Sequence, residues 1–247
     1  MKILLTNDDG YDAKNIKAIY EKLSEEHDVW IVAPKSNCSG MSAAISYLNE
    51  IEVKKIDEKI FAVDGTPADC SYLGLLSIVD FEFDIVVSGI NHGANIGNDV
   101  LYSGTVGAAV GGRNLKYPPI AISVASYDAQ DINFIAKKSC EIINKIFSAN
   151  GLLKGRVINI NFPDITEDEY KGIKATVISK RDIPARPIKL ESDSDSEEEI
   201  IVEGIRLNDI EITENDDSYL TYRNGDTFYV TINNVININL RERNSLS

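Results

Sequence analysis

Cysteine, histidine and long apolar runs are all scarce in this sequence. Its 247 residues include three scattered cysteines and two histidines, which give neither a disulfide framework nor the ligand spacing of a zinc site. Any bound metal is therefore expected to be a hard cation held by oxygen ligands. No apolar stretch approaches the length that spans a membrane, so we expect no membrane partner.

Basic residues are in the minority, and the N-terminus does not resemble a signal peptide. The chain has 25 Lys and Arg against 39 Asp and Glu, a formal net charge of −14. Such a surface repels nucleic-acid polymers over long range, although it leaves room for a small phosphate ester bound beside a cation. Only Ile3, Leu4 and Leu5 precede a polar segment, which is too short for the apolar region of a signal peptide, and we expect a cytoplasmic protein.

Three familiar motifs of phosphate and acyl chemistry are missing. The sequence contains no G-x-x-x-x-G-K-[ST] segment, no predicted strand that leads into G-x-G-x-x-G, and no G-x-S-x-G. These absences argue against a P-loop nucleotide hydrolase, a dinucleotide-binding domain and a serine hydrolase.

The hydrophobic pattern of the first two thirds of the chain predicts alternating strands and helices. Short apolar runs predict strands at residues 2–6, 29–33, 45–48, 51–56, 60–63, 83–88, 120–124 and 157–161, with 45–48 and 51–56 forming a hairpin. Apolar residues at helical spacing predict helices at residues 13–26, 68–79, 105–115 and 133–147. This alternation predicts an α/β fold with a mostly parallel sheet flanked by helices.

Beyond about residue 170 the pattern changes to strands alone. Strands are predicted at residues 173–179, 200–205, 227–232 and 235–240. The acidic run at residues 191–199 is expected to form a solvated loop or a hairpin tip. We therefore divide the chain into a core of residues 1–165 and a β-rich C-terminal arm of residues 166–247.

Two adjacent aspartates follow the first predicted strand. Asp8 and Asp9 stand where ligands bind in an open α/β sheet, outside the carboxyl ends of the strands. Neighbouring carboxylates repel each other unless they are solvated or neutralised, and a divalent cation neutralises them. Gly10 permits a tight turn that lets both carboxylates reach one ion. A solvated turn without a metal is the alternative interpretation.

Two further polar segments leave strands at the same edge of the sheet. Ser39, in the loop after the second strand, offers a hydroxyl, which is a weak neutral ligand for a hard cation. The glycine-rich segment 88–97 follows the strongest central strand and presents the amides of Asn91 and Asn95. We interpret this second segment as functional, because a structural loop rarely needs so many glycines and asparagines.

A small-residue helix follows Ser103. Ser103 is a good N-cap, and the free N–H groups at a helix N-terminus suit a phosphate group. The hydroxyl of Thr105 would add a hydrogen bond. Capping and close helix packing alone would also explain these residues, and both interpretations can hold together.

Taken together, these segments resemble the SurE family, the stationary-phase survival proteins. The resemblance is carried, in the family's order and over the first half of the chain, by TNDDG (6–10), VAP with SG (32–34 and 39–40), DGTPADC (64–70), SGINHGANIG (88–97) and LYSGTVGAA (101–109). NINFP at residues 159–163 resembles a later landmark of the family. As a set these motifs are highly specific.

The resemblance implies a Rossmann-like core and a phosphatase that hydrolyses nucleoside 5′- or 3′-monophosphates. It implies one divalent cation per subunit, expected to be Mg²⁺ or Mn²⁺, held by Asp8, Asp9, Ser39 and Asn91. It also implies that the phosphate and substrate contacts come from Asn7, His92, Asn95, Ser103, Gly104 and Thr105. Family members are homodimers or tetramers that exchange the C-terminal arm, and we expect the same here.

Metal-assisted hydrolysis is the mechanism that we expect, with Asp8 and Asp9 as catalytic residues. One aspartate, Asp9 rather than Asp8, would accept the proton of an attacking water. Direct attack by an aspartate to give an acyl-phosphate stays open. A haloacid-dehalogenase-type site is disfavoured, because it needs D-x-D spacing. The alternative function is a nucleotide-binding or regulatory protein weakened in catalysis. Two departures from the family motivate it: His92 stands where the family usually has arginine, and residues 217–232 only loosely resemble the family's ending.

Overall fold

A computed structural model describes most of the chain. The described residues are 1–148, 156–176 and 178, together with the backbone of the short strands 189–190, 201–202, 221–224, 227–230 and 235–239. The acidic run at 191–199 lies outside the described residues, as does most of the predicted strand 200–205. In the part of the chain that the structure describes, no helix is long and apolar enough to cross a membrane.

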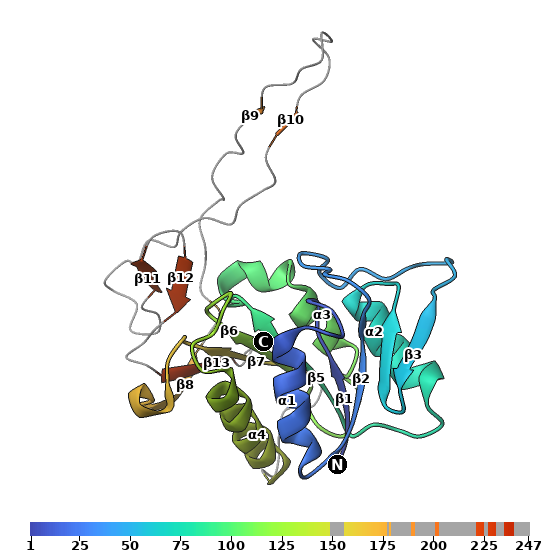
Figure 1. The fold of residues 1–247 in the computed structure, drawn as a ribbon, viewed down its shortest axis with the longest axis horizontal. Coiled ribbons are helices and arrows are strands. Elements are labelled where there is room, and N and C mark those ends of the chain that lie inside the picture. The colour runs from blue at the N-terminus through green and yellow to red at the C-terminus, as the bar shows by residue number, and fades with distance from the viewer. Residues whose placement is uncertain are drawn as a thin grey trace, which may run out of the picture.

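A nine-stranded sheet in the order β3-β4-β2-β1-β5-β6-β7-β13-β8 forms the centre of the fold (Figure 1). Six neighbouring strands are parallel: β4 (Ile60–Val63), β2 (Asp28–Pro34), β1 (Lys2–Thr6), β5 (Ile85–His92), β6 (Ile120–Val124) and β7 (Ile158–Phe162). Three outer strands run the other way: β3 (Val53–Asp57), β13 (Val235–Asn239) and β8 (Gly172–Thr176). The predicted α/β fold with a mostly parallel sheet is confirmed.

Helices cover both faces of the sheet because successive strand residues point to opposite sides. On β1, Ile3 and Leu5 belong to the core under α1 (Lys14–Ser24) and α4 (Ile132–Ser148). Leu4 belongs to a second core under α2 (Pro67–Leu73), which continues as a π-helical turn, η1 (Gly74–Ile78). The short helix α3 (Gly104–Val110) packs beside α2. Two 3₁₀ turns are η2 (Gly97–Leu101) and η3 (Glu167–Glu169).

The strand order reverses direction at β1. The chain passes from β1 to β2 on one side, and β5 then pairs with β1 on the other side. Such a switch point opens a crevice at the carboxyl ends of the two strands. The segments that follow β1 and end β5 contain Asp8, Asp9, Asn91 and His92, so the fold brings these residues to one place.

Two predicted strands were placed wrongly. Residues 45–48 form a loop, because the N–H of Ser46 donates to Asp69 rather than to a neighbouring strand. The hairpin is formed instead by β3 and β4. The strand predicted at 83–88 is shifted: β5 runs from Ile85 to His92, since it keeps pairing with β6 across a register shift between Ser88 and Asn91.

Two predicted helices were too long as α-helices. The helix predicted at 68–79 is α-helical only to Leu73, and the π-helical turn takes it to Ile78. The helix predicted at 105–115 ends at Val110, before Gly111 and Gly112, which are poor helix formers. The other predicted core elements agree with the structure to within two residues.

The C-terminal strands join the core sheet. β13 lies between β7 and β8, and it pairs antiparallel with β7 in a register that places Asn237 opposite Asn161. Two further antiparallel pairs are β9 (Lys189–Leu190) with β10 (Ile201–Val202), and β11 (Thr221–Asn224) with β12 (Thr227–Val230). The division of the chain near residue 165 stays a prediction.

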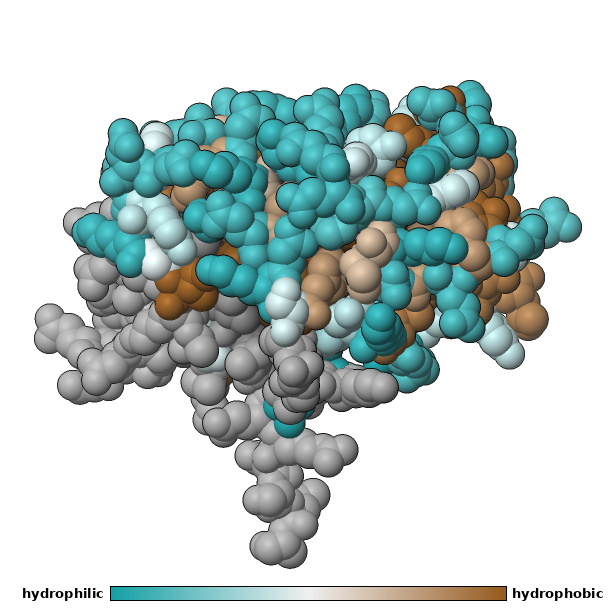
Figure 2. Space-filling view, turned by 90° about the horizontal axis from the view of Figure 1, so that it is seen from below, coloured by the Kyte–Doolittle hydropathy of each residue, from teal (hydrophilic) through white to brown (hydrophobic). Residues whose placement is uncertain are grey.

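Hydrophilic side chains cover most of the described face seen in Figure 2. Hydrophobic side chains gather at the end of the molecule that carries β3 and η1 (Figures 1 and 2). There, Leu76 on η1 is exposed, as are Val53 and Ile56 on β3. β3 is an edge strand, and its Lys54 and Lys55 are charged residues of the kind that discourage edge-to-edge pairing.

Candidate functional site

The turn after β1 is held by Asn7. The Asn7 side chain is fully buried; its Nδ2 donates to the Gly10 carbonyl at 2.8 Å, and its Oδ1 accepts from the Gly10 N–H at 3.2 Å. Gly10 has a φ of +117°, which favours glycine. Both amide atoms of Asn7 are thus used inside the loop. Its predicted contact with substrate stays a prediction, and the structure gives Asn7 the role of shaping the turn that presents the aspartates.

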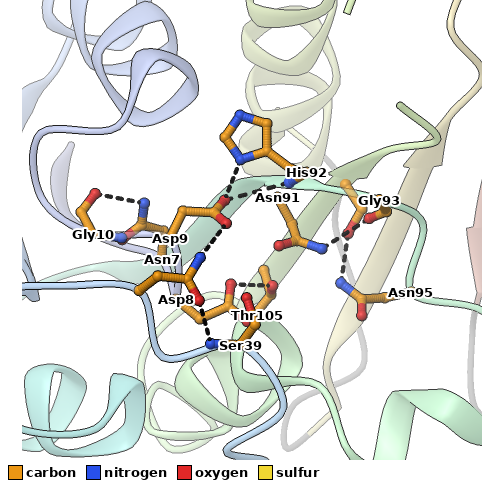
Figure 3. Close-up of polar contacts among 12 residues, drawn as sticks. Asn7, Asp8, Asp9, Gly10, Ser39, Asn91, His92, Gly93, Asn95 and Thr105 are labelled. Carbon is orange, nitrogen blue, oxygen red and sulfur yellow. Dashed lines mark hydrogen bonds and ion pairs between the residues drawn. The ribbon is translucent and has the colours of Figure 1, made fainter. Parts of the chain in front are cut away.

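Asp8 points from this turn toward the start of α3. It is 3% exposed, and its Oδ1 accepts a hydrogen bond of 2.7 Å from the Thr105 hydroxyl (Figure 3). Burial raises the pKa of Asp8 to about 6; the charge of Asp9 adds to this effect, while the Thr105 hydrogen bond opposes it. A buried carboxylate with a raised pKa lacks compensating positive charge, and this is the setting in which a bound cation is most favourable.

Asp9 lies within hydrogen-bond distance of His92, at the end of β5, and the two form an ion pair when the imidazole is protonated. The Asp9 Oδ2 lies 3.0 Å from the His92 Nδ1 and also accepts the His92 backbone N–H at 3.3 Å (Figure 3). This hydrogen bond and the charges of Asp9 and Asp8 raise the pKa of His92, against the effects of burial and of Lys14. His92 therefore lies against a carboxylate that was predicted to bind metal.

Asn91 completes the cluster from β5. Its side chain is 8% exposed, and its Nδ2 donates to the Gly93 carbonyl at 2.8 Å. This bond leaves the Oδ1 on the side that faces the two aspartates, as Figure 3 shows. An amide oxygen held in this orientation is a suitable neutral ligand for a hard cation.

Ser39 lies on an exposed loop that is tied to both aspartates. The Cys38 N–H donates to the Asp8 carbonyl at 2.7 Å. The Asn37 Oδ1 accepts the Ser39 N–H at 3.0 Å, and the Asn37 Nδ2 donates to the Asp9 Oδ1 at 3.5 Å. Asn37 was missed by the sequence reasoning, which offered no signal for it beyond its place two residues before Ser39.

The start of α3 closes the site on the other side. Ser103 is the N-cap, and its hydroxyl accepts the Val106 N–H at 3.1 Å, as predicted. Gly104 packs directly on Asp8: a Cβ added to it would lie 2.8 Å from the Asp8 Oδ2 and 2.9 Å from the Asp8 Cβ. Gly104 and Thr105 therefore both contact the buried aspartate.

Asn95 is braced by residues of β6 and β7. Its Nδ2 donates to the Ser123 hydroxyl at 2.8 Å, and its backbone N–H donates to the Asn161 Oδ1 at 2.8 Å. Its carbonyl accepts from Asn159 at 2.8 Å and from Asn161 at 3.0 Å. The sequence reasoning missed this brace. The signal was available in NINFP, where asparagines alternate with isoleucines on a buried strand.

The donor set suits a hard dication rather than zinc. The structure brings together two carboxylates (Asp8 and Asp9), the Asn91 amide oxygen and the loop that carries Ser39. Within the described residues, no group of three or more His, Cys, Asp or Glu side chains could hold a metal ion. Any cation here would be coordinated by neutral oxygen atoms in addition to the two carboxylates, and Mg²⁺ and Mn²⁺ are commonly bound by such mixed oxygen ligands.

The raised pKa of Asp8 predicts a pH-dependent cost in stability for the metal-free protein. The folded-state pKa of about 6 exceeds the ordinary 3.8, so the folded state binds the proton more tightly, and the free energy of unfolding falls as pH rises from about 4 to 6. Asp8→Asn removes this titration. With metal chelated, the variant is expected to be more stable than the wild type at about pH 7.5, by on the order of 2–3 kcal/mol.

Urea unfolding of both proteins, at about pH 7.5 and at about pH 4.5, checks this prediction. The stability difference should shrink to about a third at the lower pH, because the wild-type carboxyl is then largely protonated in the folded state. A variant that is less stable than the wild type by the same amount at both values would contradict the assignment.

The chain is similar to proteins of one family. The family model described as Survival protein SurE matches residues 3–184. The 5'-nucleotidase SurE of Pseudoalteromonas atlantica is 40% identical over 181 residues, 73% of each chain. That of Vesicomyosocius okutanii is 39% identical over 194 residues, 78% of each chain. The crystal structure of a SurE protein from Aquifex aeolicus superposes with a TM-score of 0.77 at 31% identity, and the match covers 97% of this chain and 92% of that one.

Proposed function

We propose, because this chain belongs to the SurE family and is a nucleotidase of that family, that it uses a divalent cation. The proposed reaction is the hydrolysis of nucleoside 5′- or 3′-monophosphates to nucleoside and phosphate. One observation carries the proposal. A buried carboxylate with a raised pKa, Asp8, lies beside a second carboxylate, Asp9, at the carboxyl edge of a parallel sheet. A protein that only bound phosphate would gain nothing from two uncompensated anions at this position.

Asp8, Asp9, Ser39 and Asn91 are the residues that would hold the cation, one per subunit, with Mg²⁺ or Mn²⁺ as the proposed metal. When bound, a dication supplies Lewis-acid chemistry that draws electron density from the phosphoryl group. The donor set supports this assignment, since all four residues offer oxygen atoms. Asn7, Asn37 and Thr105 hold these donors in place through the hydrogen bonds described above.

The start of α3 is proposed to bind the phosphoryl group. Gly104 and Thr105 contact Asp8, and Ser103 caps the same helix end, so this helix start lies directly beside the proposed cation ligand. Backbone N–H groups and hydroxyls of this kind stabilise charge that develops on phosphoryl oxygens in the transition state. Asn95, braced by the asparagines of β7, is proposed to contribute from the side of β5.

Asp9 is our proposed general base. Its side chain is 7% exposed, and its Oδ2 lies 3.0 Å from the His92 Nδ1, so a proton that Asp9 takes from water would pass to this ring nitrogen when His92 is neutral and its Nδ1 is unprotonated. His92 would thereby assist proton transfer at the Asp9 Oδ2 as well as bind substrate. Direct attack by one of the aspartates on phosphorus is the competing route.

A substrate panel with and without metal tests the proposed function. Purified protein is expected to release phosphate from nucleoside 5′- or 3′-monophosphates when Mg²⁺ or Mn²⁺ is present, and to lose this activity in EDTA. p-Nitrophenyl phosphate serves as a generic ester for comparison. Nucleotide binding without turnover under every metal condition would favour the regulatory alternative. Full activity in EDTA would contradict the metal-dependent proposal.

The assembly is proposed from the family alone. We propose a homodimer or tetramer formed through residues 166–247, in a cytoplasmic protein whose partner is a small nucleotide rather than a nucleic-acid polymer or a membrane. The net charge of −14 supports the exclusion of nucleic acid.

A further inference from the structure

Asp69 is a buried carboxylate that the proposed chemistry does not use. It lies on α2 and is 4% exposed. Its carboxylate accepts three hydrogen bonds, from the Ser46 N–H at 2.8 Å, the Ser46 hydroxyl at 2.7 Å and the Thr66 N–H at 2.9 Å. Burial acts to raise the pKa of Asp69, but these hydrogen bonds together hold it below its ordinary value. Asp69 is therefore a charged anchor inside the protein.

Capping the helix does not account for all of these contacts. Thr66 and Asp69 form a capping box at the start of α2. The same box occurs on η3, where Glu169 accepts from the N–H of Thr166 at 3.0 Å and from its hydroxyl at 3.1 Å. Both side-chain bonds of the η3 box stay inside the box. At α2 the carboxylate reaches beyond it, to Ser46.

Ser46 belongs to the loop of residues 37–48, which carries Ser39; we call this segment the Ser39 loop. It contains no helix or strand, so contacts with its surroundings must fix its shape. At its start the Cys38 N–H donates to the Asp8 carbonyl. Ser39 itself is exposed, as are Met41, Ile45, Tyr47 and Leu48, and little core packing holds this segment in place.

Three other hydrogen bonds hold the middle of the Ser39 loop. The Ser42 hydroxyl donates to the Leu101 carbonyl at 2.6 Å, and its N–H donates to the Tyr102 carbonyl at 3.1 Å. The Thr66 hydroxyl donates to the Ala44 carbonyl at 2.6 Å. The described loop has a charged partner at each end, Asp9 at Asn37 with a distance of 3.5 Å and Asp69 at Ser46 with the shorter distances of 2.7 and 2.8 Å. Hydrogen bonds to charged groups are the stronger kind.

We propose that Asp69 is a positioning residue for the metal site, which acts through Ser46 to hold the Ser39 loop in the conformation that presents Ser39 to the cation. This inference rests on the proposed function. A neutral hydroxyl is a weak ligand, so its contribution depends on being held in place before the cation arrives. The anchor at Ser46 and the Cys38 contact with Asp8 restrain the loop on both sides of Ser39.

Four variants separate positioning from stability. Ser46→Ala removes one bond to Asp69 and leaves the α2 cap intact, and Asp69→Asn removes the charge. Ser46→Thr keeps the hydroxyl and should restore function. Glu169→Gln, the control, makes the same carboxyl-to-amide change in the η3 capping box. Each variant is compared with the wild type by amide hydrogen exchange of residues 42–47, by the Mn²⁺ concentration that gives half-maximal activity, and by thermal unfolding.

Ser46→Ala and Asp69→Asn are expected to speed exchange in the Ser39 loop and to raise the half-maximal Mn²⁺ concentration by about threefold to tenfold. Ser46→Thr and Glu169→Gln should match the wild type in both readouts. If the wild type depends on Mn²⁺, and Ser46→Ala and Asp69→Asn need the same half-maximal Mn²⁺ concentration as the wild type, the inference is wrong and the proposed function stands. If the wild type hydrolyses nucleotides at full rate in EDTA, with no divalent cation present, the proposed metal dependence fails and the inference fails with it.

Discussion

Replacing Asp9 with asparagine is expected to lower kcat for nucleoside monophosphate hydrolysis by about 10³-fold, and Asp8→Asn is expected to do the same. Each change removes one negative charge from the pair that would hold the cation, while the side chain keeps its size. Asp9→Asn also removes the anionic partner of His92, whose Nδ1 lies 3.0 Å away. Steady-state kinetics across a range of Mn²⁺ concentrations measure the effect.

Asp12→Asn is the matched control for this experiment. Asp12 is an exposed carboxylate three residues after Asp9, and no part of the proposed site uses it. Its amide variant should keep wild-type kcat and the wild-type response to Mn²⁺. If Asp8→Asn or Asp9→Asn hydrolysed nucleotide at the wild-type rate with unchanged metal dependence, this result would contradict the proposal that the two aspartates hold a catalytic cation.

Gly104→Ala is expected to lower kcat/KM by about 10²-fold without unfolding the protein. The new Cβ would lie 2.8 Å from the Asp8 Oδ2 and 2.9 Å from the Asp8 Cβ, so the buried carboxylate must move and strain its bond to Thr105. Alanine is a better helix former than glycine by about 1 kcal/mol, which offsets part of the steric cost. Kinetics and thermal unfolding of the same preparation separate the two effects.

Gly111→Ala provides a steric control on the same face of the fold. Its Cβ would lie 2.7 Å from the Ser71 Cβ, a similar overlap that does not involve Asp8. It should lower the midpoint of thermal unfolding while kcat/KM stays within about twofold of the wild type. Equal losses of activity in the two variants would mean that Gly104 acts through general stability rather than through Asp8.

The convergence of Asp8, Asp9 and Asn91 at one sheet edge could be predicted because each of them follows or ends a strand of a parallel sheet. Parallel strands present their carboxyl ends at one edge, and two of these strands, β1 and β5, are neighbours in the sheet. Local sequence pattern was enough to find both strands. The Ser103 cap could also be predicted from local sequence, because an N-cap depends only on residues within one helical turn.

Features that depend on long-range hydrogen bonds could not be predicted. Residues 45–48 alternate like a strand, but Asp69 takes the Ser46 N–H and keeps the segment a loop. The extension of β5 to His92 depends on its pairing with β6. The brace on Asn95 comes from Asn159 and Asn161, more than 60 residues away in the chain. The sequence NINFP shows that the two asparagines lie on a buried strand, but no local pattern identifies Asn95 as their partner.

The ionic interpretation of the Asp8–Asp9 cluster is tested most directly by crystals of the wild-type protein grown with millimolar Mn²⁺. We expect a single anomalous-scattering peak that contacts a carboxylate oxygen of each aspartate and the Oδ1 of Asn91. Carboxyl groups turned away from each other, with no anomalous peak between them at saturating Mn²⁺, would contradict it.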